Sequence, residues 1–110
     1  MVTLVDKFVL IGRNQRKLSA LSVEMASKNS NVEVITLTVD FADMVDYEQI
    51  EAQLKNLDIG IFMNFVGVSY PLPQVLHQLD QTYENLSWEH MNVNIMSATN
   101  LTRIILPGLL

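Results

Sequence analysis

Three short apolar runs, separated by stretches with helical spacing, constrain the fold of this chain more than any other feature. The runs cover Lys7–Gly12, residues 32–39 and residues 58–63, and each is long enough for one strand. Buried parallel strands are near-continuous apolar runs, and parallel strands that alternate with helices are joined by right-handed crossovers. The alternation therefore predicts an α/β fold, a parallel sheet of about three strands with flanking helices.

The stretches around these runs predict helices and one loop. Gln15–Lys28 and residues 46–56 carry apolar residues three and four positions apart, and Asp46 is placed to cap the second of these helices. Residues 65–81 contain two prolines, which favours a loop. A long helix is predicted over residues 83–106, ended by a Pro-Gly pair. Its expected apolar stripe consists of Met91, Ile95, Ala98, Thr102 and Ile105.

The composition restricts the classes of function. At 110 residues the chain has room for one small domain, and 49% hydrophobic with 17% charged residues is too apolar for a disordered chain. There is no cysteine, and neither histidine has a second histidine or a carboxylate at ligand spacing, so no metal site is predicted. The net charge of −5 argues against nucleic-acid binding. No apolar stretch reaches the ~20 residues of a membrane span, and residues 1–11 lack the form of a secretory signal.

Polar residues and a glycine follow the three predicted strands. Arg13 comes directly after the first run, Asp40 after the second, and Asn64 and Gly67 after the third. Open parallel sheets bind ligands at the carboxyl ends of their strands, so these residues are candidates for one edge of a nucleotide pocket. Arg13 is placed to neutralise a ribose 2′-phosphate, and Asp40 to accept from the exocyclic amine of an adenine. Gly67 has no Cβ, so its backbone can pass close to a ligand.

Structural roles compete with these assignments. Arg13 heads a basic cluster with Arg16 and Lys17, which is equally typical of a solvated helix start. Asp40 taken alone is a common turn residue. Asn94 interrupts the apolar stripe of the last helix, so its amide either satisfies a buried partner or points into a site. The residues taken singly leave both interpretations open.

A set of motifs extends over nearly the whole chain in a fixed order. Their sequences are VLIGR at 9–13, VDFA at 39–42, IGIFMNFVGVSYP at 59–71, NVNIMS at 92–97 and LPG at 106–108. With this order and spacing, the chain resembles the short-chain dehydrogenase/reductase family. The resemblance is to the branch that holds 17-beta-hydroxysteroid dehydrogenases and very-long-chain 3-oxoacyl-CoA reductases.

The resemblance implies a Rossmann-like sheet that binds NADP(H), and reduction of a ketone on a steroid or long-chain 3-oxoacyl substrate by hydride transfer. It assigns Arg13 to the 2′-phosphate that distinguishes NADP, and Asp40 to the adenine. It places Asn64 and Gly67 in a turn that supports the sheet beside the nucleotide. Asn94 is similar to the asparagine of the family's catalytic tetrad, which holds a water in the proton relay.

The chain also departs from the family. It has no glycine-rich phosphate turn, and none of its tyrosines, Tyr47, Tyr70 and Tyr83, is followed four residues later by a lysine. The family needs that pair because the lysine lowers the pKa of the tyrosine that protonates the forming alkoxide. Phe65 stands where the family has its second asparagine. We therefore expect residues 1–110 to form a single incomplete Rossmann-type domain, a truncated chain that is inactive by itself.

A non-catalytic remnant is the alternative interpretation, acting as an interaction or dimerisation module. An incomplete parallel sheet leaves strand edges and apolar faces open, and these would pair in a homo- or hetero-oligomer. Phe65 and the missing glycine turn favour this alternative. The resemblance alone implies the endoplasmic reticulum as the location, and a small lipid or steroid as the substrate of the full-length relatives. No nucleic-acid partner is expected.

Overall fold

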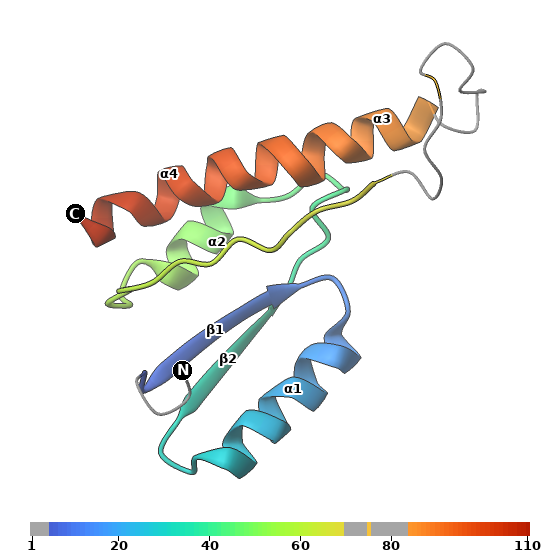
Figure 1. The fold of residues 1–110 in the computed structure, drawn as a ribbon. Helices are drawn as coiled ribbons and strands as arrows, with labels where there is room; N and C mark the ends of the chain where they lie inside the picture. The colour runs from blue at the N-terminus through green and yellow to red at the C-terminus, as the bar shows by residue number, and fades with distance from the viewer. Residues whose placement is uncertain (1–4, 70–74, 76–83) are drawn as a thin grey trace. The chain divides into compact units, whose positions relative to one another are not determined.

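The computed structural model describes residues 5–69, 75 and 84–110. The chain forms two compact units, Met1–Asp40 and Phe41–Leu110. Figure 1 draws the first unit in blue to teal and the second in green to red. Both units contain helices, whereas the paired strands of the described residues all belong to the first unit.

The first unit is a β-α-β motif made of β1 (Lys7–Gly12), α1 (Gln15–Lys28) and β2 (Glu33–Thr38) (Figure 1). The two strands are parallel, with Lys7 opposite Glu33 at one end and Gly12 opposite Thr38 at the other. Helix α1 packs against both strands, so it is the crossover that a parallel pair requires. The predicted strands and helix of this region are confirmed.

Local signals explain the ends of α1. The Asn14 side chain accepts a hydrogen bond of 3.1 Å from the backbone N–H of Lys17, which satisfies one free donor of the first turn. In the last turn, Lys28 lies 3.3 Å from Glu24 one turn earlier, and a cation there complements the helix dipole. The helix turns Met25 inward, and the chain then buries Val32 ahead of β2. These two residues form the core of the unit.

The second unit is mainly helical. Helix α2 (Tyr47–Leu54) begins after Asp46, whose carboxylate accepts from the backbone N–H of Gln49 at 3.1 Å, so the predicted cap is confirmed. Three further elements follow one another as one long helix in Figure 1. They are α3 (Glu84–His90), a π-helical segment η3 (Met91–Met96) and α4 (Ser97–Leu109), and α4 packs against α2. The buried apolar residues of this unit are Phe41, Ile50, Leu54, Val93, Leu101 and Ile105.

The predicted third strand is wrong. Residues 58–69 form an extended segment without regular secondary structure, so the described sheet has two strands where the sequence predicted about three. Residues 59–63 have the composition of a strand, but a strand also requires a neighbour for its backbone N–H and C=O groups, and no described residue of the same unit provides one. Of the loop predicted over 65–81, residues 65–69 have no regular structure, and most of the remainder, including both prolines, lies outside the described residues.

The long helix differs from the prediction in the face that it buries. The predicted stripe includes Met91 and Ile95, but these side chains are 50% and 49% exposed. The buried face instead repeats every four residues through Val93, Ser97 and Leu101 and ends at Ile105, the one predicted stripe residue that is buried. The prediction assumed a regular α-helix throughout, whereas the π-helical segment holds more residues per turn and rotates the side chains before α4 begins.

The expected stop at the Pro-Gly pair is also wrong, because α4 continues to Leu109 with Pro107 inside it. A proline in a helix interior removes one donor, but near the last turn this loss affects a single hydrogen bond. Beyond it, the backbone N–H of Leu110 donates to the carbonyl of Leu106 at 3.2 Å, so the helical pattern is recovered across the proline.

Candidate functional site

In the first unit, Arg13 and Asp40 both follow the carboxyl ends of paired strands. The backbone N–H of Val39 donates to the carbonyl of Gly12 at 2.8 Å, which continues the parallel ladder by one step beyond β2. Arg13 comes directly after Gly12, and Asp40 directly after Val39, and both side chains are exposed. The structure therefore places these two candidates at the same end of the β1–β2 pair, as the sequence predicted. Their roles toward a nucleotide remain predictions.

The cationic character of this end extends into α1. Arg16 and Lys17 lie in the first turn of the helix and are exposed, like Arg13 before it. No carboxylate forms an ion pair with these three cations among the described residues, since the two ion pairs there involve Lys7 and Lys28. A group of exposed, uncompensated cations is suited to an anionic ligand such as a phosphate.

In the second unit, Asn94 holds the extended segment through two hydrogen bonds to one residue. Its Oδ1 accepts from the backbone N–H of Val68 at 2.8 Å, and its Nδ2 donates to the carbonyl of the same residue at 2.9 Å. One amide thus satisfies both backbone groups of Val68, in the way that a neighbouring strand would. The amide therefore satisfies a partner, but Asn94 and both bonds are exposed, so the buried partner that the sequence suggested is wrong. The catalytic role of Asn94 stays a prediction.

Asn64 and Gly67 belong to the same short segment. The Asn64 Oδ1 accepts from the backbone N–H of Val66 at 3.1 Å, an Asx turn that bends the chain just before Gly67. A Cβ built on Gly67 would lie 3.5 Å from the Asn94 Oδ1, which is ordinary van der Waals contact. The structure therefore brings Asn64, Gly67 and Asn94 together. We call residues 64–68 together with Asn94 the asparagine clasp.

Asn92, to which no sequence pattern assigned a role, anchors the same helix to another loop. Its Nδ2 donates to the carbonyl of Ala42 at 3.3 Å, so the π-helical segment is attached by Asn92 to the loop before α2 and by Asn94 to the extended segment. On a regular α-helix, residues two positions apart do not share a face. A prediction based on α-helical spacing places Asn92 and Asn94 on different faces, so it assigns a role to Asn94 and none to Asn92.

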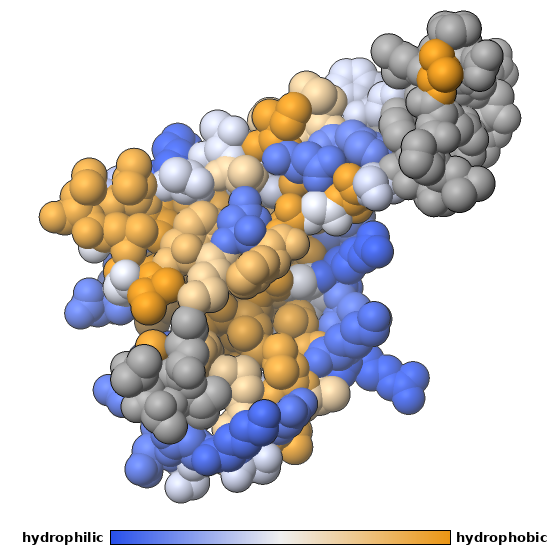
Figure 2. All heavy atoms as spheres, viewed as in Figure 1, coloured by the Kyte–Doolittle hydropathy of each residue, from blue (hydrophilic) through white to orange (hydrophobic). Residues whose placement is uncertain are grey.

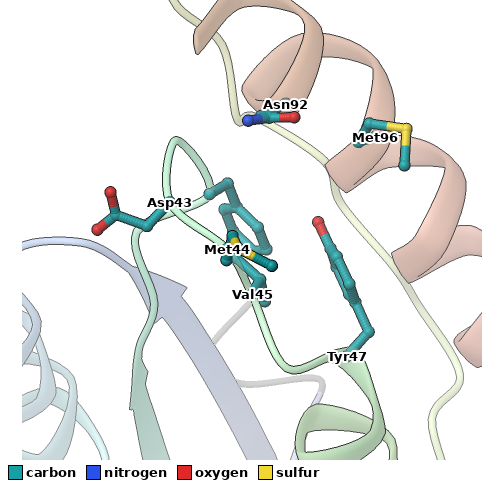
Figure 3. Close-up of a pocket in the computed structure, with 7 residues that line it drawn as sticks. Asp43, Met44, Val45, Tyr47, Asn92 and Met96 are labelled. Carbon is teal, nitrogen blue, oxygen red and sulfur yellow. The ribbon is translucent and has the colours of Figure 1, made fainter. Parts of the chain in front are cut away.

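A pocket of about 180 Å³ lies beside Asn92 (Figure 3). Phe41 in its wall is only 5% exposed and stacks on Tyr47 with ring centroids 6.4 Å apart, so Phe41 is a core residue of this unit. Pockets for small ligands commonly measure about 300–1,000 Å³, so this pocket is too small for a dinucleotide. Its lining consists of Phe41, Asp43, Met44, Val45, Tyr47, Asn92 and Met96.

Tyr47 is the one described group whose pKa departs clearly from its ordinary value. Partial burial raises the pKa of the Tyr47 hydroxyl above 10.0, because the phenolate loses water contacts, and a hydrogen bond with Asn100 opposes this rise. In Figure 3 the hydroxyl of Tyr47 is directed toward the long helix. A phenol with a raised pKa is protonated at neutral pH and does not act as a base there.

No group of histidine, aspartate and glutamate side chains in the described residues is arranged to hold a metal ion. Among the helices that the structure describes, none combines the length and the hydrophobicity that a membrane span requires.

The chain is similar in sequence to several very-long-chain 3-oxoacyl-CoA reductases. It is 39% identical to the reductase of Mus musculus over 106 residues and 38% identical to that of Homo sapiens over 103 residues, with 94% of this chain covered in both cases. It is also 37% identical over 102 residues, 92% of the chain, to a human protein named inactive hydroxysteroid dehydrogenase-like protein 1. The chain spans only 32% of each reductase and 30% of the inactive protein. No family model matches it.

Two solved enzymes share the fold. The bulky-bulky ketone specific alcohol dehydrogenase of Comamonas testosteroni matches with a TM-score of 0.70 at 17% identity, over 90% of this chain and 38% of its own. The L-sorbose reductase of Gluconobacter frateurii, solved with NADPH and L-sorbose, matches with a TM-score of 0.60 at 18% identity, over 92% of this chain and 37% of its own. The structural matches confirm the α/β fold, and the sequence matches confirm the resemblance stated from the motifs.

Proposed function

Since this chain is a relative of the short-chain dehydrogenase/reductase enzymes, we propose that it forms the nucleotide-binding part of an NADP-dependent oxidoreductase. The identity of 36–40% to very-long-chain 3-oxoacyl-CoA reductases carries this proposal. The reaction is the reduction of a ketone on a steroid or a long-chain 3-oxoacyl substrate. The two units would then be parts of one Rossmann-type domain.

The residues of the first unit fit the adenosine half of the cofactor. Arg13 supplies a guanidinium for the 2′-phosphate, and Asp40 supplies a carboxylate for the exocyclic amine of the adenine. Both lie at the carboxyl end of the strand pair, which is where open parallel sheets bind ligands. The exposure of Arg13 and the absence of an ion pair to it in the described residues support this assignment.

The residues do not fit the pyrophosphate equally well. A dinucleotide cradle needs several glycines in one turn, and the four glycines of this sequence, Gly12, Gly60, Gly67 and Gly108, are far apart along the chain. Gly12 has Leu18 carbons about 3.4 Å from the position of a Cβ, so it is in contact with α1. We therefore assign only the adenosine end of the cofactor to these residues.

Bound NADPH supplies the hydride that reduces a carbonyl carbon in enzymes of this kind. In this chain, Asn94 would support the site by fixing the backbone of Val68 and by lying in contact with Gly67. The alkoxide must also receive a proton, and these 110 residues hold no Tyr-x-x-x-Lys pair to donate it. We thus assign to this chain cofactor recognition and support of the site, and not the acid.

Titration with adenosine 2′,5′-bisphosphate tests the proposal directly. This probe contains the adenine, the ribose and the 2′-phosphate and lacks the second half of the cofactor. We expect it to bind more tightly than 5′-AMP, and we expect Arg13→Ala to remove roughly a tenfold preference, since a charge-assisted hydrogen bond is worth about 1.5–3 kcal/mol. Lys28→Ala is the matched control, because Lys28 is paired with Glu24 at the far end of α1. Equal binding of the two nucleotides to the parent protein would refute the assignment of Arg13.

A non-catalytic interaction module is the second candidate function. One relative with 37% identity is named an inactive hydroxysteroid dehydrogenase-like protein, and this chain has Phe65, 88% exposed, in the turn between Asn64 and Gly67. An exposed phenyl ring is typical of a contact surface for another protein. Absence of nucleotide binding together with self-association would favour this function. Location at the endoplasmic reticulum is proposed from the resemblance alone.

A further inference from the structure

The loop at residues 41–46, which leads into α2, is fixed at three places within the second unit. At its start, Phe41 is buried in the core. At its end, the Asp46 carboxylate caps α2. Between these two, the carbonyl of Ala42 accepts a hydrogen bond of 3.3 Å from the Nδ2 of Asn92. Of the two hydrogen bonds, the cap is local, whereas the bond from Asn92 joins residues fifty positions apart.

Asn92 is well placed to act as an anchor. It is half-buried on the π-helical segment, and in Figure 3 its side chain points from the long helix toward the loop. Its bond to Ala42 is partly buried, so water competes with it less than with an exposed bond. The segment that carries Asn92 is itself held, because Val93 is buried and Asn94 is bonded to Val68. A donor on a fixed helix restricts the loop that it binds.

The anchored carbonyl of Ala42 lies two residues after Asp40. On the other side of Asp40, the backbone N–H of Val39 is bonded to the carbonyl of Gly12. Only a few backbone torsions therefore separate Asp40 from a fixed residue in either direction, since each residue contributes two. Without the bond from Asn92, the chain that follows Asp40 gains conformational freedom. The constraint passes along the chain itself, so it acts in any arrangement of the two units.

We propose that Asn92 is a positioning residue for the recognition of the adenine base, acting through Ala42 on the backbone that carries Asp40. This inference rests on the proposed function, in which the Asp40 carboxylate accepts from the exocyclic amine of the adenine. A hydrogen bond weakens steeply when its geometry is poor, so freedom in the backbone beside Asp40 weakens this contact. Asn92 thus sets the preference for adenine over a base without that amine, and it has no part in the recognition of the 2′-phosphate.

Two binding preferences separate this role from a general effect on folding. The preference for adenosine 2′,5′-bisphosphate over 5′-AMP reports on Arg13, which precedes α1, and Figure 2 shows hydrophilic surface over the start of that helix. The preference for 5′-AMP over purine riboside 5′-monophosphate reports on Asp40, because the second nucleotide lacks only the exocyclic amine. We expect the parent chain to prefer 5′-AMP roughly fivefold, as one hydrogen bond predicts. Isothermal titration calorimetry measures both preferences.

Asn92→Asp tests the proposal, since it keeps the size of the side chain and replaces the donor by an acceptor that repels the Ala42 carbonyl. We expect it to reduce the preference for 5′-AMP to about twofold or less and to leave the 2′-phosphate preference unchanged. Asn92→Gln keeps an amide donor and should recover part of the loss. Asn31→Asp is the matched control, because Asn31 is exposed and precedes β2, at the opposite end of this strand from Asp40. It should change neither preference.

Hydrogen exchange of the free chain gives a second readout, since the amides of residues 41–45 should exchange faster in Asn92→Asp than in the parent or in Asn31→Asp. Asn92→Ala takes the place of Asn92→Asp if that variant does not fold by circular dichroism. An unchanged base preference in the Asn92 variant, or an equal fall of both preferences, would overturn the proposal. A parent chain that prefers the 2′-phosphate without preferring adenine would overturn it and leave the assignment of Arg13 intact. A parent chain that binds none of the three nucleotides would overturn the proposed function and this inference with it.

Discussion

The two units of this chain differ in the sequence separation of the contacts that hold them together. In Met1–Asp40, the contacts join elements that are near in sequence. Strand β1 pairs directly with β2, α1 connects the two, and Asn14 caps the start of α1. In Phe41–Leu110, the key contacts join distant segments, as Asn94 bonds to Val68 and Asn92 to Ala42. The bounds of the helix and strands in the first unit follow from local sequence. The extended segment of the second unit is instead held by Asn94, a residue distant in the sequence.

An apolar run therefore permits a strand to form, but the strand forms only where a neighbour pairs with its backbone. Lys7–Gly12 and residues 58–63 have similar composition, but only the first has a hydrogen-bonded neighbour in the described structure. Five residues beyond the end of this second run, the Asn94 side chain makes two bonds to the backbone of Val68, of the kind that a neighbouring strand would make. The asparagine clasp thus holds residues 64–68 at a place where the described residues form no ladder.

The largest effect is expected from a cavity in the core of the second unit. Leu101 is 3% exposed on the face of α4 that is buried, so Leu101→Ala should lower the free energy of unfolding by about 2–5 kcal/mol. Hydrogen exchange should show the loss in α2 and α4, with smaller changes in β1 and β2. Met25→Ala is the converse variant, since Met25 is buried in the first unit, and it should reduce protection in β1, α1 and β2 more than in α2 and α4. If Leu101→Ala exposed the β1 and β2 amides to the same degree as those of α4, the two units would form one cooperative structure.

The second effect concerns the clasp. Asn94→Ala removes both bonds to Val68, and because these bonds are exposed, water replaces them in part, so the free energy of unfolding should fall by about 0.5–1.5 kcal/mol. Asn94→Asp keeps the acceptor for the Val68 N–H but loses the donor to its carbonyl, so its cost should be intermediate. Urea denaturation of the parent and both variants measures this order.

Equal stability of the parent chain and both variants would show that the clasp is dispensable. If Asn94→Ala and Asn94→Asp had no effect on unfolding, residues 64–68 would be held by packing alone. The extended segment would then require no special anchor, and the contrast between the two units would weaken.

The sequence predicts most of the fold because most of its signals are local. The bounds of β1 and α1 and the cap at Asp46 follow from apolar spacing and from residues that bond within one turn. The π-helical segment could not be predicted from apolar spacing, and its two asparagines bond to segments that are distant in the sequence. The buried stripe of the long helix was wrong for the same reason, because one π-helical turn changes the face that later residues present.

The candidate site is predictable only in part. Motif order indicated Asn64, Gly67 and Asn94, and the structure brings these three together in one unit. Arg13 and Asp40 lie together at the end of the strand pair, as strand-end reasoning predicts. Asn92 and the Phe41–Tyr47 stack were not assigned roles, since neither a bond over fifty positions nor a ring contact leaves a periodic signal.

The smallest effect is expected on the free energy of unfolding at high pH, where the ionisation of Tyr47 affects the second unit. Tyr47 lies in the second unit, and the first contains no tyrosine. Because burial raises the pKa of Tyr47 in the folded chain, the neutral phenol favours the folded state. The unfolded chain ionises first, so this contribution is complete below about pH 10 and is lost as the pH rises through the raised pKa.

Tyr47→Phe removes this dependence and keeps the stack on Phe41. The difference in unfolding free energy between the parent and Tyr47→Phe should therefore be constant from pH 7 to about pH 9 and should shift in favour of the variant above about pH 10. Chemical denaturation monitored by the far-ultraviolet circular dichroism of the helices measures it. A difference that stayed constant up to pH 11 would mean that Tyr47 titrates equally in the folded and unfolded chains, and that burial does not raise the pKa of its hydroxyl.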